Sequence, residues 1–522
     1  MFEKAAWSAP ALGGVALLLL VTWLSASAGM ELTGGQFSYC LDDAYIHLAI
    51  AKNLALHHVW GATRFEFSSA SSSPLWTLLL TLGTIVMRAP REWLPFAFAL
   101  PCAAAVVAIS SRRWMRGPDF PRRAMLCFLL AAALVLLAPL PALVLSGMEH
   151  PLQIALVIAY AFELEAVLLE HERTLVPLAL LGALASACRY ESLMLIAPAS
   201  LLLLARGRLR AALVGGGAGL LPAIAFGLFS IAHGSEALPN SVLLKAGAPH
   251  LLRGLQTLRS APHLVAALIA LAGVVALLHR VGTAKALALR DVCAAVCAAL
   301  LLHVQFARVG WFFRYEAWLL ALAIALVGAA ALDHAEELRI YFARTRFVPI
   351  AAFLALVALL VAPSARAARA LRDTPRAMRN IVDQQRQVGL FLGALPGRSL
   401  ALNDIGCAAY FADVRILDLA GLASIDVARA IRAHDVSPER LDGLIRGHGV
   451  EFALLHEKLF HAALPRAWVL VARWRAPDNY LLGEDTVSLF AADAQRAAEL
   501  RAHVVQFLPQ LPGEDDVWLN PE

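Results

Sequence analysis

Long apolar blocks without a single charge constrain this chain more than any other feature of its sequence. Residues 11–20 and 125–145 are examples, since neither block contains an acidic or basic residue. Overall, 60% of the 522 residues are hydrophobic and 16% are charged, whereas ordinary soluble domains are about half apolar and about a quarter charged. Uncharged blocks approaching about 20 residues are long enough to cross a membrane. The sequence therefore predicts an α-helical, polytopic membrane protein.

Eleven membrane-spanning helices are predicted from these blocks. They lie near residues 11–28, 93–110, 124–146, 151–169, 174–188, 191–205, 211–232, 263–279, 290–307, 315–332 and 347–363. The apolar stretch at 74–87 is not counted, because Lys and Arg are retained on the cytoplasmic side of a membrane. Without that span, every basic turn falls on the side of the N-terminus, and the strongest of these turns contains Arg112, Arg113, Arg116, Arg122 and Arg123.

This topology divides the chain into two predicted domains. Residues 1–363 form the transmembrane domain, and within it residues 30–92 form a long first outer loop with two helices along the membrane surface. An odd number of spans places residues 364–522 on the outer face as well, while the N-terminus stays cytoplasmic. The net charge of +5 is small for this length, and no nucleic-acid-binding motif is present, so nucleic acid is not an expected partner.

The composition changes after residue 363, where Arg, Asp and Glu become frequent. Short apolar runs at 415–419, 450–455 and 468–473 predict strands. Ser437, followed by a proline and a glutamate, is typical of a helix start. Strands that alternate with helical stretches predict a small α/β soluble domain.

Two adjacent carboxylates, Asp42 and Asp43, follow the first span. An acidic residue at a helix N-terminus satisfies free N–H groups and complements the helix dipole, and this capping role accounts for one of the pair. The other is open to a role as general base or metal ligand. The residues alone do not decide which is which, and two adjacent carboxylates do not by themselves make a site for a divalent cation.

Further polar residues fall on the same predicted outer face. Glu149 and His150 lie at the end of one span and the start of the next, where a helix cap is the alternative to a site. Arg189 and Glu191 form either an internal pair that fixes helix packing or part of an anion-binding site; arginine at an outer boundary runs against the usual charge bias and favours the second role.

The remaining polar residues each have two possible interpretations. Lys245 is either a phosphate ligand or an interfacial lysine that extends to the headgroups. Arg314 and Tyr315 belong either to an aromatic belt or to a site for phosphate or sugar. The segments that begin at Asn403 and Asp418 are either turns after strands or parts of the outer site.

Carboxylates together with arginine and lysine at a membrane surface suit one chemistry in particular. The cations hold a lipid-linked phosphate. A carboxylate deprotonates an acceptor hydroxyl, which attacks the anomeric carbon of a sugar as the phosphate leaves. Ionisable residues near a membrane are rare unless they have a function, so their shared face supports a glycosyltransferase.

The chain resembles the GT-C superfamily of membrane glycosyltransferases, which includes protein O-mannosyltransferases, lipid A aminoarabinose transferases and cell-wall arabinofuranosyltransferases. The similar segments are Asp42-Asp-Ala-Tyr-Ile, Asn53-Leu, Ser72-Ser-Pro-Leu-Trp-Thr, Ser146-Gly-Met-Glu-His-Pro, Asn403-Asp-Ile-Gly and Leu417-Asp-Leu-Ala-Gly-Leu. The resemblance covers essentially the whole chain. It implies a GT-C-like fold in a bacterial inner membrane, a polyprenyl-phosphate sugar as donor, and a glycan, lipid or protein of the cell envelope as acceptor.

The resemblance also implies roles for individual residues. An Asp of the first loop is the catalytic base, and Asp43 falls at that position with Asp42 beside it. Glu149 matches the second acidic motif and is expected to be catalytic, and His150 beside it is expected to contact the donor or substrate. A basic–acidic pair of the bacterial members corresponds to Arg189 and Glu191. By position, the donor phosphate or substrate is expected to meet Lys245, Arg314 and Tyr315. No metal ligand is assigned.

The chain departs from its bacterial relatives near the expected acceptor side. The stretch Ser68-Ser-Ala-Ser-Ser-Ser-Pro replaces a Gly-Tyr-Thr-Asn stretch, and Leu56-His-His-Val-Trp replaces a glycine-rich turn. The acceptor therefore cannot be copied from a relative. Two other functions stay open: a non-catalytic or polymerase-like assembly protein of the envelope, and a transporter, which would place polar residues at mid-membrane in matching halves.

Overall fold

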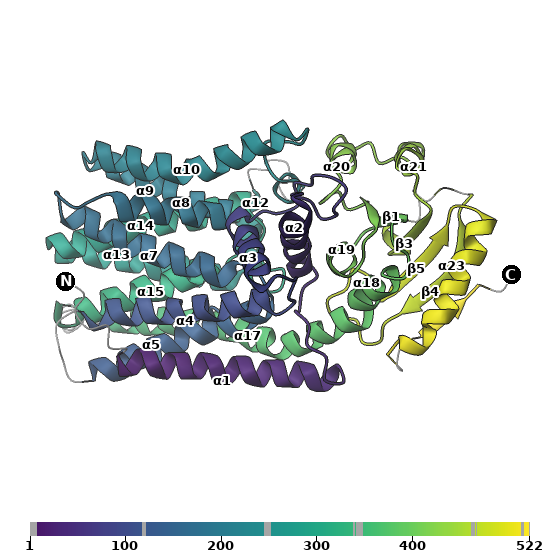
Figure 1. Ribbon diagram of the computed structural model, residues 1–522. Helices are drawn as coiled ribbons and strands as arrows, with labels where there is room; N and C mark the ends of the chain where they lie inside the picture. The colour runs from purple at the N-terminus through teal and green to yellow at the C-terminus, as the bar shows by residue number, and fades with distance from the viewer. Residues whose placement is uncertain are drawn as a thin grey trace. The chain divides into compact units, whose positions relative to one another are not determined.

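The computed structural model describes residues 8–116, 122–244, 252–337, 340, 348–460, 465, 467–512 and 516–520 (Figure 1). The chain forms two compact units. Unit 1 comprises Met1–Ser25, Phe96–Ala225 and Ala246–Arg372, and unit 2 comprises Ala26–Pro95, Phe226–Lys245 and Asp373–Glu522. Unit 2 thus contains the predicted first loop together with the C-terminal domain. The predicted domain boundary at 363/364 stays a prediction.

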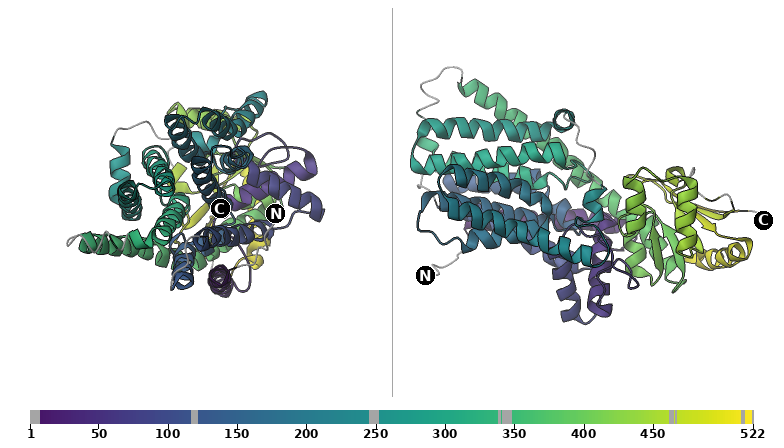
Figure 2. Two further views of the ribbon diagram at one scale, coloured as in Figure 1. Left: turned by 90° about the vertical axis from the view of Figure 1, so that its left-hand side faces the viewer. Right: turned by 90° about the horizontal axis from the view of Figure 1, so that it is seen from above.

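Unit 1 is a bundle of helices that run side by side (Figure 2). Its elements are α1 (Ala9–Leu32), α4 (Leu94–Met115), α5 (Arg123–Leu137), α6 (Leu140–Leu145), α7 (His150–Leu169), α8 (Val176–Cys188), the 3₁₀ turn η1 (Tyr190–Ser192), α9 (Leu193–Ala205), α10 (Leu209–Ala232), α12 (Arg253–Ser260), α13 (Pro262–Val281), α14 (Ala284–Phe306), α15 (Ala317–Asp333) and α17 (Val348–Asn380). The C-terminal parts of α1, α10 and α17 extend beyond the residue limits of unit 1.

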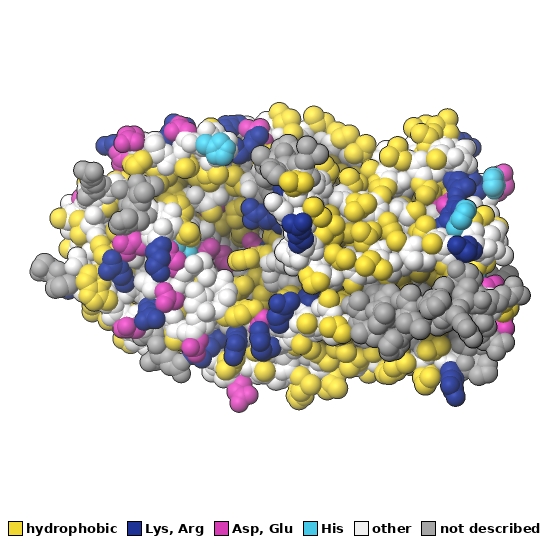
Figure 3. Space-filling view, turned by 180° about the vertical axis from the view of Figure 1, so that it is seen from behind, with side chains coloured by type: hydrophobic (Ala, Val, Ile, Leu, Met, Phe, Trp, Pro, Cys, Tyr) yellow, Lys and Arg dark blue, Asp and Glu magenta, His cyan; other side chains and the backbone are white. Residues whose placement is uncertain are grey.

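Six helices in the described part of the chain are long and apolar enough to cross a membrane: α1, α4, α7, α10, α13 and α14. Shorter apolar helices accompany them. Hydrophobic side chains cover much of the helical surface in Figure 3, and Trp23, Leu201 and Leu228 are each more than 60% exposed. Such a surface is unfavourable in water and favourable in lipid. The chain is a multi-pass membrane protein; the total of eleven spans stays a prediction.

One predicted span is not a single helix. The block at 124–146 is divided into α5, which ends at Leu137, and α6, which begins at Leu140. Pro139 and Pro141 lie at the division. Proline has no N–H to donate and its ring clashes with the preceding turn, so a helix that reaches this pair ends and starts again. Hydropathy alone could not register the break, because proline leaves the block apolar.

Unit 2 is built around a six-stranded mixed sheet. The strands are β1 (Ser399–Leu402), β2 (Arg415–Asp418), β3 (Phe452–Leu455), β4 (Val469–Arg475), β5 (Thr486–Ala491) and β6 (Asp516–Leu519), in the order β2-β1-β3-β5-β4-β6. The pairs β1–β2 and β1–β3 are parallel, with Leu400 opposite Ile416 and Phe452, and the remaining pairs are antiparallel. The predicted α/β domain and its strands β2, β3 and β4 are confirmed.

Helices and short helical turns complete unit 2. They are α2 (Asp43–His57), α3 (Pro74–Met87), α11 (Asn240–Leu243), the π-helix η2 (Ile381–Arg386), α18 (Gln387–Leu392), α19 (Gly406–Phe411), α20 (Ile425–Arg432), α21 (Pro438–Gly447), α22 (Glu457–Phe460), α23 (Ala494–Phe507) and the 3₁₀ turn η4 (Leu508–Gln510). Leu417 of β2 and Phe490 of β5 pack in one core with Val427 of α20 and Leu444 of α21. The predicted cap is present, since the Ser437 side chain accepts a hydrogen bond from Arg440 N.

The two helices predicted within residues 30–92 are α2 and α3. Helix α3 begins at Pro74, where the missing N–H costs nothing because the first turn has no partner for it. Whether α2 and α3 lie along a membrane surface stays a prediction.

Candidate functional site

The carboxylate of Asp42 does not cap its own helix. Asp42 stands at the N-cap position of α2 but makes no side-chain cap bond there. Instead, Asp42 Oδ2 accepts from Gly406 N at 2.7 Å and Oδ1 accepts from Cys407 N at 2.8 Å. These are the free amides at the start of α19, which lack partners within their own helix. Asp42 therefore anchors α19 of the C-terminal domain to the first loop within unit 2.

Gly406 is required for this approach. A Cβ atom at Gly406 would lie 2.1 Å from the backbone oxygen of Asp42 and 2.7 Å from its Oδ2. Both distances are shorter than any ordinary contact, so only glycine lets the two segments meet so closely. The glycine of the Asn403-Asp-Ile-Gly segment thus has a steric reason that the sequence did not reveal.

The other end of α19 is held by Lys52 of α2. Lys52 Nζ donates to Ala409 O at 2.9 Å and to Tyr410 O at 2.7 Å. Burial lowers the pKa of Lys52 to about 8, although the charge of Asp413 opposes this shift. An acidic group at the start and a basic group at the end both match the helix dipole. Helix α2 therefore clamps α19 at its two ends.

A third carboxylate, Asp404, belongs to the same acidic group. Burial, and then the negative charge of Asp404, raise the pKa of Asp42 to about 7. The pKa of Asp404 is raised as well, by burial first, and the charge of Asp43 adds to the shift. We call Asp42, Asp43 and Asp404 the acidic cluster. Like charges held together make proton transfer near neutral pH accessible to carboxyl groups.

Neutral and basic partners hold Asp404 in place. Gln385 Nε2 of the π-helix donates to Asp404 Oδ2 at 3.4 Å, and His456 Nε2 lies 3.7 Å from the same oxygen. Asn403 fixes the histidine, since Asn403 Oδ1 accepts from His456 N at 2.8 Å. Short π-helical turns are frequent at functional sites. The Asn403 segment belongs to the resemblance, but nothing in the sequence pattern marks Asp404, Gln385 or His456 as functional residues.

The segment at Asp418 closes a turn. Its two carboxylate oxygens accept from Ala420 N at 2.9 Å and Ala423 N at 2.7 Å. The side chain is fully buried, and burial raises its pKa to about 6. Of the two readings of this segment, the turn after a strand is the one that these bonds support.

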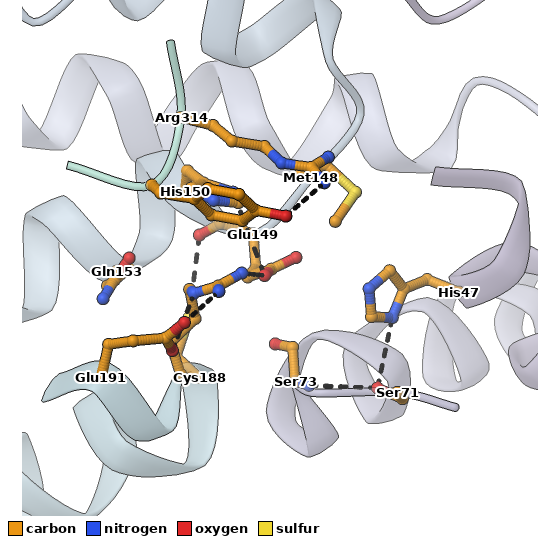
Figure 4. Close-up of polar contacts among 12 residues, drawn as sticks. His47, Ser71, Ser73, Met148, Glu149, His150, Gln153, Cys188, Glu191 and Arg314 are labelled. Atoms are coloured by element: carbon orange, nitrogen blue, oxygen red, sulfur yellow. Dashed lines mark hydrogen bonds and ion pairs between the residues drawn. The ribbon is translucent and has the colours of Figure 1, made fainter. Parts of the chain in front are cut away.

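The serine-rich stretch before α3 is buried and hydrogen-bonded. His47 Nδ1 of α2 lies 3.3 Å from Ser71 Oγ (Figure 4). The same nitrogen lies 3.1 Å from Thr77 Oγ1. Ser71 Oγ and Thr77 Oγ1 are 3.0 Å apart. The stretch that departs from the bacterial relatives therefore joins α2 to α3 through a buried polar network.

Unit 1 contains a separate cluster around Arg189. Its Nη1 lies 2.5 Å from Glu149 Oε1, while its Nε and Nη2 bind the two oxygens of Glu191 at 3.2 and 2.5 Å (Figure 4). His150 Nδ1 is 3.9 Å from the same Glu149 oxygen. The side chains of Glu149 and His150 are almost completely buried. Four of the predicted residues are thus brought together, and Arg189 and Glu191 form the internal ion pair that was one of the two alternatives for them.

Arg314 and Tyr315 lie beside this cluster in unit 1. Arg314 Nη2 donates to Tyr315 Oη at 3.2 Å, and the guanidinium groups of Arg314 and Arg189 lie 5.0 and 5.8 Å from the Tyr315 ring centre. Arg314 is only 1% exposed. Tyr315 therefore connects the two arginines through its ring and its hydroxyl.

A second buried ion pair in unit 1 was not predicted from the sequence. Glu316 Oε1 binds Arg366 Nε at 3.0 Å and lies 3.3 Å from His263 Nε2. Glu316 Oε2 accepts from Gly310 N at 2.8 Å. Arg366 lies just beyond the last predicted span, and an arginine at such a position is predicted to lie at the surface. Its burial depends on partners 50 or more residues away in sequence, and hydropathy does not carry that information.

Two predicted positions remain to be placed. Lys245 lies outside the described residues. As for metals, the described part of the chain contains no group of three or more His, Cys, Asp or Glu side chains that could hold an ion. The acidic cluster consists of charges that influence one another without forming such a ligand set.

Comparisons with known proteins address the fold. The family model "Domain of unknown function (DUF8728)" matches residues 378–490, a range that includes Asp404, Gly406 and His456. No curated protein sequence matches the chain. Among solved structures, ArnT from Cupriavidus metallidurans, bound to undecaprenyl phosphate, is similar with a TM-score of 0.52 and 11% identity, over 92% of this chain and 98% of that one.

Two other structures are similar with lower scores. The Archaeoglobus fulgidus oligosaccharyltransferase, tethered to an acceptor peptide, has a TM-score of 0.47 and 10% identity, over 96% of this chain and 75% of that one. The arabinofuranosyltransferase AftD from Mycobacteria has a TM-score of 0.46 and 14% identity, over 92% of this chain and 42% of that one. The likeness to ArnT shows a GT-C-like fold, and the resemblance predicted from the sequence is confirmed at that level.

Proposed function

We propose that this protein transfers a sugar from a polyprenyl-phosphate donor to a hydroxyl group of a cell-envelope acceptor. The observation that carries the proposal is the GT-C-like fold, shared along 92% of the chain with ArnT, whose structure holds undecaprenyl phosphate. A fold alone does not define a reaction. Unit 2 has carboxylates in the acidic cluster and unit 1 has the guanidinium groups of Arg189 and Arg314, and this reaction requires both kinds of group.

Asp43 is the proposed general base. Both oxygens of its neighbour Asp42 are engaged by the amides of Gly406 and Cys407, so Asp42 fits a positioning role. Asp43, the first residue of α2, is half-buried and follows directly on that anchor. The acceptor hydroxyl gives its proton to Asp43 while its oxygen bonds to the anomeric carbon. The bond from that carbon to the phosphate oxygen breaks, and the polyprenyl phosphate leaves with the electron pair.

Arg314 and Tyr315 are the proposed ligands of the donor phosphate. A guanidinium and a phenol are both good donors to phosphate oxygens. Because Tyr315 already accepts from Arg314, its own proton becomes a stronger donor. Arg189 is bound by the carboxylates of Glu149 and Glu191 and fits an organising role, while His150 lies beside Glu149.

The membrane placement belongs to the same proposal. The arginine-rich turns favour a cytoplasmic N-terminus and an outer-face reaction in a bacterial inner membrane. Lys245 stays a candidate for the donor phosphate by position alone. The acceptor is a glycan, a lipid or a protein of the envelope.

Transfer from a panel of labelled polyprenyl-phosphate sugars into membrane acceptors tests the proposal. Removing a general base typically costs two to four orders of magnitude in rate, about 10²–10⁴-fold. We expect that loss in Asp43→Asn and no change in Asp435→Asn, which alters an exposed aspartate of the same unit. Equal transfer by the protein and Asp43→Asn would exclude Asp43 as the base. Absence of transfer from every donor would favour the assembly or transport alternatives.

A further inference from the structure

A cavity of about 520 Å³ in unit 1 is rich in basic side chains. We call it the basic pocket. Its basic residues are Arg112 and Arg113 of α4, Arg116 just after α4, Arg173 from the turn between α7 and α8, and Lys285 of α14. Three acidic residues line it too, Glu163, Glu165 and Glu170, so basic residues outnumber acidic ones by five to three.

Ion pairs hold the frame of the basic pocket. Arg113 Nη2 lies 2.7 Å from Glu165 Oε1 and 2.8 Å from Asp333 Oδ2, and Lys285 Nζ lies 3.0 Å from the same Asp333 oxygen. The Arg113 side chain is only 11% exposed. Across the pocket, Arg173 binds Glu163 at 2.8 Å. The acidic residues therefore neutralise and orient these three cations.

The other two basic side chains of the pocket are not neutralised in this way. Arg112 and Arg116 are exposed, and neither forms an ion pair with another residue in the part of the chain that the structure describes. Burial, and then the positive charges of Arg112, Arg113 and Arg173, lower the pKa of Arg116. A guanidinium that is surrounded by others gains from an added anion. The excess charge of the pocket is concentrated on this side.

The remaining wall of the pocket is apolar. Ile109, Phe162, Leu169 and Leu181 line it, and the Phe162 ring centre lies 5.8 Å from the Arg113 guanidinium. The pocket is built where α4 and α7 end and where α14 begins. Ends of apolar helices lie at the depth of lipid headgroups, and the arginine count predicts that this end faces the cytoplasm. Phosphate and hydrocarbon would both find matching surfaces there.

We propose that the basic pocket binds the phosphate of an anionic phospholipid in the leaflet on that side, with Arg112 and Arg116 as the ligands and the apolar wall in contact with the acyl chains. Basic pockets between membrane helices on the cytoplasmic side commonly hold such headgroups. This lipid site is distinct from the proposed donor site at Arg314 and does not depend on the proposed activity.

Lipid binding to the purified full-length protein tests the site. Phosphatidylglycerol and phosphatidylcholine are titrated in the same detergent and scored by native mass spectrometry, with inorganic phosphate as a separate arm. We expect preference for phosphatidylglycerol. Each cation near an anionic surface strengthens binding about five- to sixfold, so we expect the double variant R112Q/R116Q to bind this lipid about thirtyfold more weakly.

A matched control removes two cations from a neighbouring cavity. Arg208 and Arg210 line a space of about 850 Å³ that shares Arg173 with the basic pocket. The variant R208Q/R210Q is expected to bind phosphatidylglycerol as the unaltered protein does, and thermal unfolding verifies that both variants fold. The proposal would be overturned if R112Q/R116Q bound phosphatidylglycerol as tightly as the unaltered protein, or if both double variants lost the same amount of affinity. Tight binding of inorganic phosphate without a preference for the lipid would overturn the lipid assignment.

Discussion

The contact between Gly406 and Asp42 gives the sharpest prediction about unit 2. In Gly406→Ala, the new methyl group would lie 2.1 Å from Asp42 O, whereas ordinary contact begins at 3.4 Å. The first loop and α19 must separate by about 1 Å, which stretches hydrogen bonds of 2.7 and 2.8 Å beyond the roughly 3.5 Å at which such bonds cease to count. We therefore expect both bonds from the α19 amides to Asp42 to be lost.

The expected cost follows from those two bonds. A hydrogen bond to a charged group contributes about 1.5–3 kcal/mol, so two lost bonds cost about 3–6 kcal/mol. Alanine in place of glycine recovers up to about 1 kcal/mol of chain entropy. The net loss of about 2–5 kcal/mol corresponds to a Tm lower by about 10 °C in a unit of this size.

Thermal unfolding in detergent at pH 8, where most of the Asp42 carboxyl is ionised, measures this loss. The matched control is Gly443→Ala, because a Cβ at Gly443 meets nothing within 4 Å and alanine favours the helix there. We expect the control to melt at the same temperature as the unaltered protein or slightly above it. If Gly406→Ala melts with the control, the close approach of Asp42 to α19 is wrong.

Two further predictions concern charge. The fold raises the pKa of Asp42 from 3.8 to about 7, so between these pH values the native state binds more protons than the unfolded chain. The stability that this group contributes is therefore fully present below about pH 4 and is lost as the pH rises through about 7. Asp42→Asn should flatten the dependence of Tm on pH between 5 and 8, and an unchanged slope would contradict the assignment. Arg189→Lys should lower stability by about 1.5–3 kcal/mol, because the lysine ammonium keeps the charge but loses at least one charge-assisted hydrogen bond to the buried Glu149 or the partly buried Glu191. Arg206→Lys, at a pair whose arginine is 44% exposed, should cost less than about 1 kcal/mol, and equal losses in the two variants would refute the buried-pair argument.

Elements governed by local sequence were predictable. The apolar blocks became helices because hydrophobic composition over about 20 residues is a local property. The start of α21 was predictable because Ser437 caps it through a residue three positions away. Strands β2, β3 and β4 were predicted from runs of apolar residues. Strand β1 (Ser399–Leu402) was not predicted, because its pairing with β2 and β3, and not its own residues, defines it as a strand.

The candidate site was predictable only in part. Asp42, Asp43, Arg189 and Glu191 were found because carboxylates and arginines next to apolar spans are unusual in themselves. Asp404 was not, because its place in the acidic cluster depends on a contact between segments more than 360 residues apart, measured by the Asp42–Gly406 bond. An acidic residue in a soluble domain is ordinary until its neighbours are known.

The clamp on α19 explains why a soluble domain matters to a residue of the first loop. Helix α2 carries Asp43 at its start, and Asp42 and Lys52 of the same segment bind the two ends of α19. Two anchors, at the N-cap Asp42 and at Lys52 within the helix, fix the rotation of α2 as well as its position, so Asp43 cannot turn without breaking a charged contact. Asp404, two residues before α19, is carried by the same clamp. The position and the charge environment of the proposed base are therefore both set by the domain that follows the last helix of the membrane bundle, and loosening that domain should reduce transfer without touching any residue that contacts the sugar.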